Sequence, residues 1–303
     1  MAVETTSTLS GEIMTAYQAK FLARSKDTLV HQEGLQKKTR ETGEGKSVVF
    51  NRYTPLAVAT TPLTEGANGS EVAMTASQVT ATLAEYGNYI KVAKLLKLTS
   101  VDEDAEEKVD VLAQNMAETI DTLARDALTG GATVCYAGAK TALSDVAASN
   151  TLSAAELRKV RRALLKAKAM KNKAGFFFGK IGPDTEMDLI GDSTWVNAHS
   201  YKDGENLYKG YLGTLYGVDF LMATNAKSES STVSVYSNIF HGDQAAGAYD
   251  LSKDVPKVYI KVPNANDTSN PLDRFSTIGW AGTYVAKVLV SAWVINWKSG
   301  ATA

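Results

Sequence analysis

The stretch 100–131 predicts a single long helix and constrains the fold more than any other part of the sequence. Ser100 and Glu103 have the spacing of a capping box, and acidic residues stand at the N-terminal end, where the helix dipole favours negative charge. Gly130-Gly131 marks a stop. About 28 residues at 1.5 Å per residue make a rod of roughly 42 Å, two to three times the usual helix length. Such a rod spans a domain.

One face of this predicted helix is apolar and the other is polar. The apolar positions recur at alternating steps of three and four, which places them on one stripe. The expected inward residues are Ala105, Val109, Leu112, Met116, Ile120, Leu123 and Ala127, and the opposite face carries Glu106, Lys108, Asp110, Gln114, Glu118 and Arg125.

Composition excludes several classes of protein. The 303 residues include 32 Lys and Arg against 33 Asp and Glu, so the whole-chain charge gives no support to an electrostatic nucleic-acid or membrane binder. The single Cys135 excludes an intrachain disulfide, and with three histidines it leaves too few ligands for a Cys/His zinc site. No apolar run approaches about 18 residues and no signal-peptide pattern opens the chain, so we expect no membrane span and a cytoplasmic site of synthesis.

Ahead of the helix, the sequence predicts a polar arm over 1–47 and a long hairpin over 48–98. Strand residues such as Val48 and Phe50 begin the first half, and a second strand is predicted from Val79 to Val92, across a turn-rich stretch at 55–75. An isolated hairpin is marginal in water. The residues leave two readings open: the hairpin packs on a neighbouring subunit, or it lies at the edge of the chain's own sheet.

Two separated groups of residues resemble a known family. The first is TPLTEG at 61–66 with VTAT at 79–82 and YGNY at 86–89; the second is NPLDRFSTIGW at 270–280 followed by AKVL at 286–289. They resemble major capsid proteins of tailed phages related to that of coliphage N-four. The resemblance runs from about Val48 to Trp297.

The resemblance implies an α+β chain with the Hong Kong 97-type phage capsid fold. In that fold an arm (1–47) precedes an extended β-hairpin loop (48–98), a peripheral domain with a long spine helix (99–149), an axial domain (150–262) and a return strand of the peripheral domain (263–303). Residues 284–297 are apolar on both alternating faces, which independently predicts a strand covered on both sides.

Within 150–262, a capping box at Ser153 and Glu156 predicts a helix through about Lys171. Its expected inward residues are Leu157, Val160, Leu164, Ala167 and Met170. Phe176-Phe177-Phe178 predicts a buried strand, Pro183 a helix start, and the glycine-aromatic alternation at 206–223 paired short strands.

The outer face of the helix that begins near Ser153 is strongly basic. Eight of the sixteen positions at 158–173 are positive: Arg158, Lys159, Arg161, Arg162, Lys166, Lys168, Lys171 and Lys173. Three readings stay open: contact with a neighbouring subunit, a solvated face, or contact with packaged nucleic acid. No aromatic residue interleaves the charges, so a groove that stacks single-stranded bases is not supported.

The resemblance implies a structural protein, the major capsid protein of a phage virion, which assembles with itself as hexamers and pentamers into an icosahedral shell around double-stranded DNA in the host bacterial cytoplasm. A separate scaffolding protein, a portal and a decoration protein are the further partners it implies. The residues expected at inter-subunit contacts are Pro62, Leu63, Glu65, Gly66, Tyr86, Arg158, Arg161, Arg162 and Lys166. The alternative of the same fold is an encapsulin-like bacterial compartment.

The sequence offers no constellation for catalysis, and we expect no enzyme, cofactor or metal. His31, His199 and His241 lack the motifs of catalytic histidines, and Cys135 has the character of a small buried residue. Gly45-Lys46-Ser47 ends like a phosphate-binding loop, but position 40 is Arg40 instead of the required glycine and a strand follows. A nucleotide-dependent enzyme is therefore the disfavoured alternative.

Overall fold

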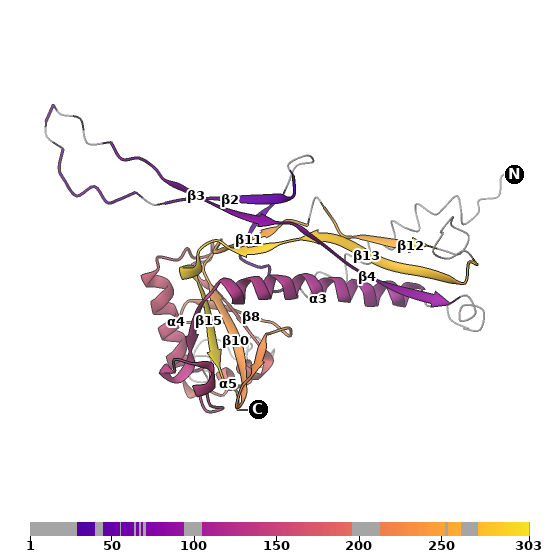
Figure 1. Ribbon diagram of the computed structural model, residues 1–303. Coiled ribbons are helices and arrows are strands. Elements are labelled where there is room, and N and C mark those ends of the chain that lie inside the picture. The colour runs from indigo at the N-terminus through magenta and orange to yellow at the C-terminus, as the bar shows by residue number, and fades with distance from the viewer. Residues whose placement is uncertain are drawn as a thin grey trace.

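The computed structural model describes residues 29–39, 45–54, 56–63, 65–66, 68, 71–93, 105–195, 213–251, 254–261 and 272–302, with the side chains of 105 and 106 excepted. A long helix, α3 (Ala105–Gly131), lies between a three-stranded sheet and a seven-stranded sheet, and a two-stranded hairpin projects beyond both (Figure 1). The expected α+β class is confirmed.

Helix α3 confirms the predicted rod with 27 residues, and the predicted cap at Ser100 and Glu103 lies outside the described residues. Val109, Leu112, Met116 and Ile120 are buried, as expected. Beyond them the buried apolar positions are Ala124 and Leu128, whereas the expected Leu123 and Ala127 are only partly covered. The stripe continues in steps of four there, and the helix contacts the seven-stranded sheet as well as the three-stranded one.

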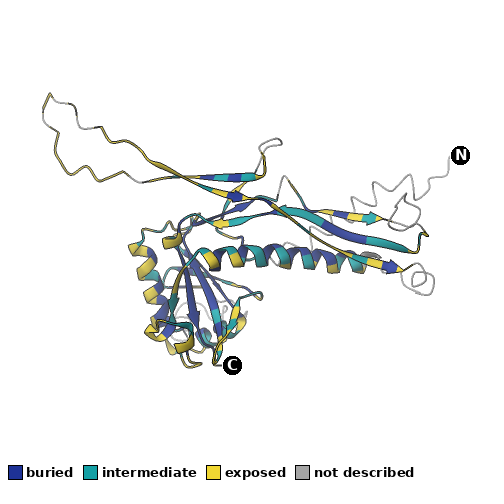
Figure 2. Ribbon diagram, viewed as in Figure 1, coloured by how far each residue is buried: buried dark blue, intermediate teal, exposed yellow. Residues whose placement is uncertain are grey.

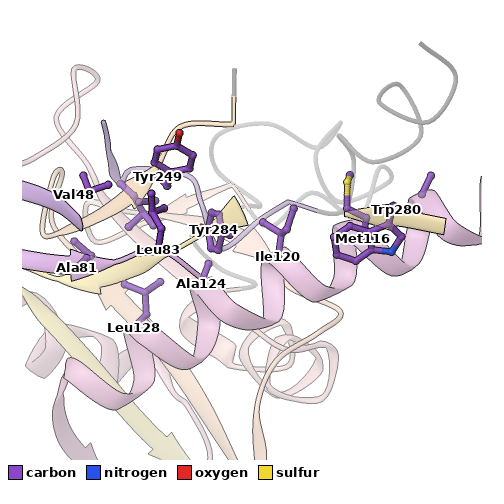
Figure 3. Packing of buried hydrophobic residues seen from close by; sticks show 14 of the residues in the cluster. Val48, Ala81, Leu83, Met116, Ile120, Ala124, Leu128, Tyr249, Trp280 and Tyr284 are labelled. Atoms are coloured by element: carbon purple, nitrogen blue, oxygen red, sulfur yellow. The ribbon is translucent and has the colours of Figure 1, made fainter. Parts of the chain in front are cut away.

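The three-stranded antiparallel sheet covers α3 and forms the first hydrophobic core with it. Its order is β12 (Lys257–Lys261), β13 (Phe275–Tyr284), β4 (Ala84–Ala93). Trp280 and Tyr284 point from β13 toward Met116, Ile120 and Ala124 of the helix (Figure 3). The indole Nε1 of Trp280 donates to Asn115 Oδ1 at 3.1 Å, which satisfies a donor that burial would otherwise leave unpaired.

The strand predicted from Val79 to Val92 is two strands in different sheets. β3 (Ala76–Thr82) pairs with β2 (Ser47–Tyr53) as the projecting hairpin, whereas β4 pairs with β13 along its whole length. Buried Leu83 separates them, and its amide donates to Lys46 O at 2.9 Å at the base of the hairpin. The expected hairpin over 48–98 therefore ends near residue 82, because residues 84–93 pair with the longer strand β13; residues 94–98 lie outside the described residues.

The seven-stranded mixed sheet carries the second core. Its order is β5 (Thr133–Tyr136), β15 (Val294–Ser299), β10 (Ser234–His241), β6 (Phe177–Ile181), β8 (Val218–Met222), β7 (Thr214–Leu215), with β9 (Ser228–Ser230) beside β10. Ile239 and Val294 face the first core, and their neighbours Phe240 and Ile295 face the second. The sheet is therefore buried on both faces at its centre (Figure 2).

The predicted strand over 284–297 is also divided. Chain order there is β14 (Ala286–Val288), a 3-10 turn (Ser291–Trp293) and β15. β14 joins β1 (Gln36–Lys38) and β11 (Ala246–Tyr249) in a small sheet, while β15 pairs with β10 and β5. Strand β15, near the end of the segment 263–303, thus lies in the seven-stranded sheet instead of the sheet over α3. The alternation of apolar side chains at 284–297 suits a strand in either sheet.

Two α-helices cover the second core. α4 (Ala154–Lys166) begins at the predicted cap, where the Ser153 side chain accepts from the Glu156 amide. It ends five residues before the expected Lys171, and Met170, expected inward, is exposed. α5 (Pro183–Ile190) begins at Pro183 as expected, and short 3-10 turns lie at Ala137–Ala139 and Leu143–Asp145.

Candidate assembly surfaces

The first candidate surface is the far end of the projecting hairpin, residues 54–75, which we call the hairpin tip. The β2–β3 ladder closes where the Thr54 amide donates to Thr75 O at 2.9 Å, and the chain beyond extends away from the body (Figure 1). Its large apolar side chains are exposed: Leu56, Val58, Leu63, Val72 and Met74. Apolar groups on a protruding segment with no core of its own mark a surface that another molecule covers.

Four of the expected contact residues lie in this hairpin tip. Pro62, Leu63, Glu65 and Gly66 are all exposed, and Gly66 adopts a positive φ of 77°. That backbone conformation suits glycine, which supplies the bend at the end of the hairpin. Glu65 and Glu71 are the charged residues of 54–75, so the hairpin tip is acidic as well as apolar.

The second candidate surface is a hollow on the face of the three-stranded sheet that is turned away from α3. Strand register sets Tyr89, Gly279 and Tyr259 side by side in one row, and Lys91, Thr277 and Lys261 in the next. Both tyrosines are more than half exposed. The glycine forms the floor, because a Cβ there would come within 2.6 Å of Tyr89 Cβ. We call this hollow the trough.

The trough is positively charged and aromatic. Lys91 Nζ lies 4.9 Å from the centre of the Phe275 ring and 5.8 Å from that of Tyr89, so cation–π contacts hold the ammonium over the surface. Lys257 stands one row further along the same face of β12. This arrangement can bind an extended acidic segment with apolar side chains. Sequence reasoning missed it, because only the pairing of β4, β13 and β12 brings the rows together.

Tyr86, another expected contact residue, belongs to neither surface. It lies on β4 facing α3, where it is partly buried against the first core. Its neighbours Gly87 and Tyr89 have the opposite orientation and line the trough. The motif at 86–89 therefore serves the chain's own core with one residue and an open surface with two others.

The third candidate surface is the outer face of α4. Arg158, Arg162 and Lys166 are exposed, whereas Arg161 is partly covered and its Nε is buried without a hydrogen-bond partner. Arg158 lies over the Tyr216 ring at 5.8 Å, and Lys159 pairs with Glu156 at 2.7 Å. Contacts within the chain thus engage some of the eight charges, while the others keep the face positive.

The candidate groups for catalysis that the sequence raised lie on separate segments of the chain where the structure describes them. Gly45-Lys46-Ser47 leads into strand β2 instead of a helix. The described part of the chain holds no cluster of His, Cys, Asp or Glu with metal-binding geometry. His241 and His31 are buried, burial raises the pKa of the Cys135 thiol, and His199 lies outside the described residues. Among the described helices, none has the length and apolarity to cross a membrane.

Comparisons with known proteins give a consistent fold. No protein-family model matches the chain, and no curated protein matches it either. Among solved structures, the capsid of Ralstonia phage GP4 is similar with a TM-score of 0.72 at 14% identity, over 91% of this chain and 91% of that one. The capsid of cyanophage Pam1 has a TM-score of 0.68 at 16% identity, covering 92% of each chain.

A third solved structure, the capsid of cyanophage P-SCSP1u, has a TM-score of 0.66 at 11% identity, over 90% of this chain and 88% of that one. At these identities the similarity concerns the fold. The fold is that of tailed-phage capsid proteins of the Hong Kong 97 type, over about nine tenths of the chain. The expected fold is confirmed.

Proposed function

We propose that this chain is the major capsid protein of a tailed-phage head, which assembles as hexamers and pentamers into an icosahedral shell around double-stranded DNA. The observation that carries the proposal is the hairpin tip, whose apolar side chains protrude from a chain that has a phage capsid fold. A monomer leaves this apolar surface in water, and assembly buries it. The virion is then the protein's location, and the bacterial cytoplasm its place of assembly.

The hairpin tip and the trough are complementary, and we infer that they meet between neighbouring copies. The hairpin tip offers Glu65 and Glu71 beside exposed aliphatic side chains. The trough offers Lys91 and Lys261 beside two tyrosines. Both surfaces are on the same chain but differ from each other, so their contact is heterologous and generates a ring when the rotation closes.

Charge exchange tests this contact. Lys91→Glu with Lys261→Glu places acidic residues on both sides and should abolish particle formation, because like charges across an interface repel. Glu65→Lys with Glu71→Lys should do the same. Combining all four substitutions should restore particles, as measured by sedimentation and electron microscopy. A quadruple variant as defective as the two doubles would refute the pairing.

Electron microscopy of the high-molecular-weight fraction, from cells making the chain with and without a candidate scaffold, tests the function itself. We expect closed shells, tubes or capsomer rings. A version in which a two-residue Asn-Gly turn replaces 56–73 should remain folded by circular dichroism but form none of them. Clean monomers of the unaltered chain under both conditions would overturn the proposal, and protein cargo in place of DNA inside native particles would favour the encapsulin-like alternative.

The finer assignments belong to the same proposal. The motifs at 61–66 and 270–280 support a relationship to the coliphage N-four capsid protein, and the division into arm, extended loop, peripheral domain and axial domain follows from that relationship. A scaffolding protein, a portal and a decoration protein are proposed partners. The exposed charges of α4 support a contact with a neighbouring subunit or with packaged DNA.

A further inference from the structure

Four ionisable side chains from separate elements meet where residues 29–39 cross the junction between α3 and the seven-stranded sheet. They are Lys180 of β6, Asp121 of α3, His241 of β10 and His31 of the crossing segment, and all four are buried. Buried charges are rare unless they are paired, so this cluster needs an explanation beyond packing.

The cluster holds the backbone of one turn from two sides. Lys180 Nζ donates to the carbonyl oxygens of His31 and Glu33 at 2.8 and 2.9 Å. Asp121 accepts from the His31 amide at 2.7 Å, and its other oxygen lies 2.7 Å from His31 Nδ1. These hydrogen bonds to charged groups tie residues 31–33 to both a helix and a sheet.

The next residue packs as closely. Gly34 has a φ of 74°, and a Cβ there would lie 2.4 Å from the Phe178 ring and 2.9 Å from the His241 ring. The two rings stack with their centres 5.2 Å apart. His241 Nε2 is buried without a hydrogen-bond partner, so a proton added there would be a buried, unpaired charge.

We propose that this cluster is an acid-sensitive latch, which fixes residues 29–39 on the body of the protein at neutral pH and releases them on acidification. Asp121 and the exposed Glu33 supply the negative charges that face the cluster; Lys180 and Arg125 supply the positive ones, and Tyr284 of β13 lies near Asp121. Each proton added to a histidine therefore enters a site where positive charges already outnumber the buried carboxylate.

The direction of the pH dependence follows from the buried bases. Burial lowers the pKa of Lys180 to about 7, against the opposing effect of Asp121 and Glu33. Burial also lowers the pKa of His31, although the hydrogen bond to Asp121 opposes it, and holds the pKa of His241 well below its usual value. The cluster therefore binds more protons when the segment is open than when it is closed. For Lys180 this holds between about pH 7 and the ordinary pKa of lysine, and for the histidines it holds below about pH 6.5. Closure weakens steadily as pH falls.

Release would reach the hairpin. The segment continues into β1, which pairs with β11, and Lys38 Nζ donates to Val49 O in strand β2 of the hairpin. Opening of 29–39 would thus remove a contact at the base of the surface that carries the hairpin tip.

Hydrogen exchange on the unassembled full chain tests the latch, with exchange times corrected for the intrinsic pH dependence. Between pH 7.5 and 5.5 we expect protection of residues 31–38 to fall by about tenfold or more, while α4 keeps its protection. His31→Asn retains a donor to Asp121 but does not titrate, and Lys180→Met removes the buried charge at similar length. Each should make protection of 31–38 distinctly less dependent on pH.

Lys298→Met is the matched control, because it removes a lysine from an ion pair with Glu229 on the same sheet, away from the latch. In this variant, protection of residues 31–38 should depend on pH as it does in the unaltered chain. Protection of 31–38 that stays constant from pH 8.5 to 5.5 in the unaltered chain would overturn the proposal, even where a variant fails to fold. An unchanged pH dependence in both folded latch variants would overturn it too.

Discussion

At the scale of single residues, the ends of α4 show how local chemistry fixes an element. Ser153 caps the start through its side chain, as the sequence predicts. The other end closes where the Lys168 amide donates to Leu165 O and the Ala169 amide donates to Leu164 O, both at 3.0 Å. This is a Schellman motif, and it places Lys168 in the left-handed region with a φ of 53°. Glycine would normally occupy that position, so no stop signal for the helix could be read there from the sequence.

Lys168→Gly should therefore stabilise the chain by about 0.5–1 kcal/mol, because glycine adopts a positive φ without the steric cost that a Cβ imposes. Denaturant unfolding of the unassembled protein measures the change. Lys166→Gly is the matched control: it lies within α4 and should destabilise by up to about 1 kcal/mol. Equal effects of the two substitutions would show that the Lys168 backbone is not strained.

At the scale of elements, α3 is positioned by close contact with strands from distant parts of the sequence. Helix α3 ends at Gly131, within the glycine pair that the sequence predicts as its stop. A Cβ on Gly131 would lie 2.6 Å from Val288 Cβ of β14, whereas a Cβ on Gly130 would meet nothing within 4 Å. The second glycine is thus a packing residue that lets β14 approach the helix.

Gly131→Ala should destabilise the chain by about 1–2 kcal/mol, because the clash with Val288 outweighs the better helix propensity of alanine. Gly130→Ala should stabilise it by about 0.5–1 kcal/mol, since only the propensity changes. The free energy of unfolding of each variant, measured under conditions that keep the protein unassembled, checks the pair. Stabilisation by both substitutions would mean that β14 lies further from the helix than described.

At the scale of the whole molecule, two cores share the seven-stranded sheet, and the hairpin tip lies outside both (Figure 2). Amides in the hairpin tip have no strand partner beyond the pair Thr54 and Thr75 within the described residues. They should exchange rapidly in the unassembled chain and gain protection of about tenfold or more in assembled particles, because assembly covers them. Mass spectrometry of peptides from 56–66 checks this, with α3 as the internal reference. Fast exchange in both states would contradict burial of the hairpin tip.

The sequence alone determined the elements whose signals are local. The long helix, the cap at Ser153, the buried strand at Phe177 and the apolar, turn-rich hairpin each follow from periodicity, side-chain hydrogen bonding or turn chemistry within a few residues. The motifs at 61–66 and 270–280 also pointed to the fold that the comparisons confirm.

Only the tertiary structure decided which strands pair. A run of strand residues such as 79–92 has the same alternation whether it stays in one sheet or crosses at Leu83 into another, and 284–297 is equally apolar in either environment. The trough and the buried cluster around Lys180 arise from residues far apart in the chain, so no local pattern predicts them. The physical reason is that register and charge pairing are properties of contacts between segments, which a single stretch of sequence does not contain.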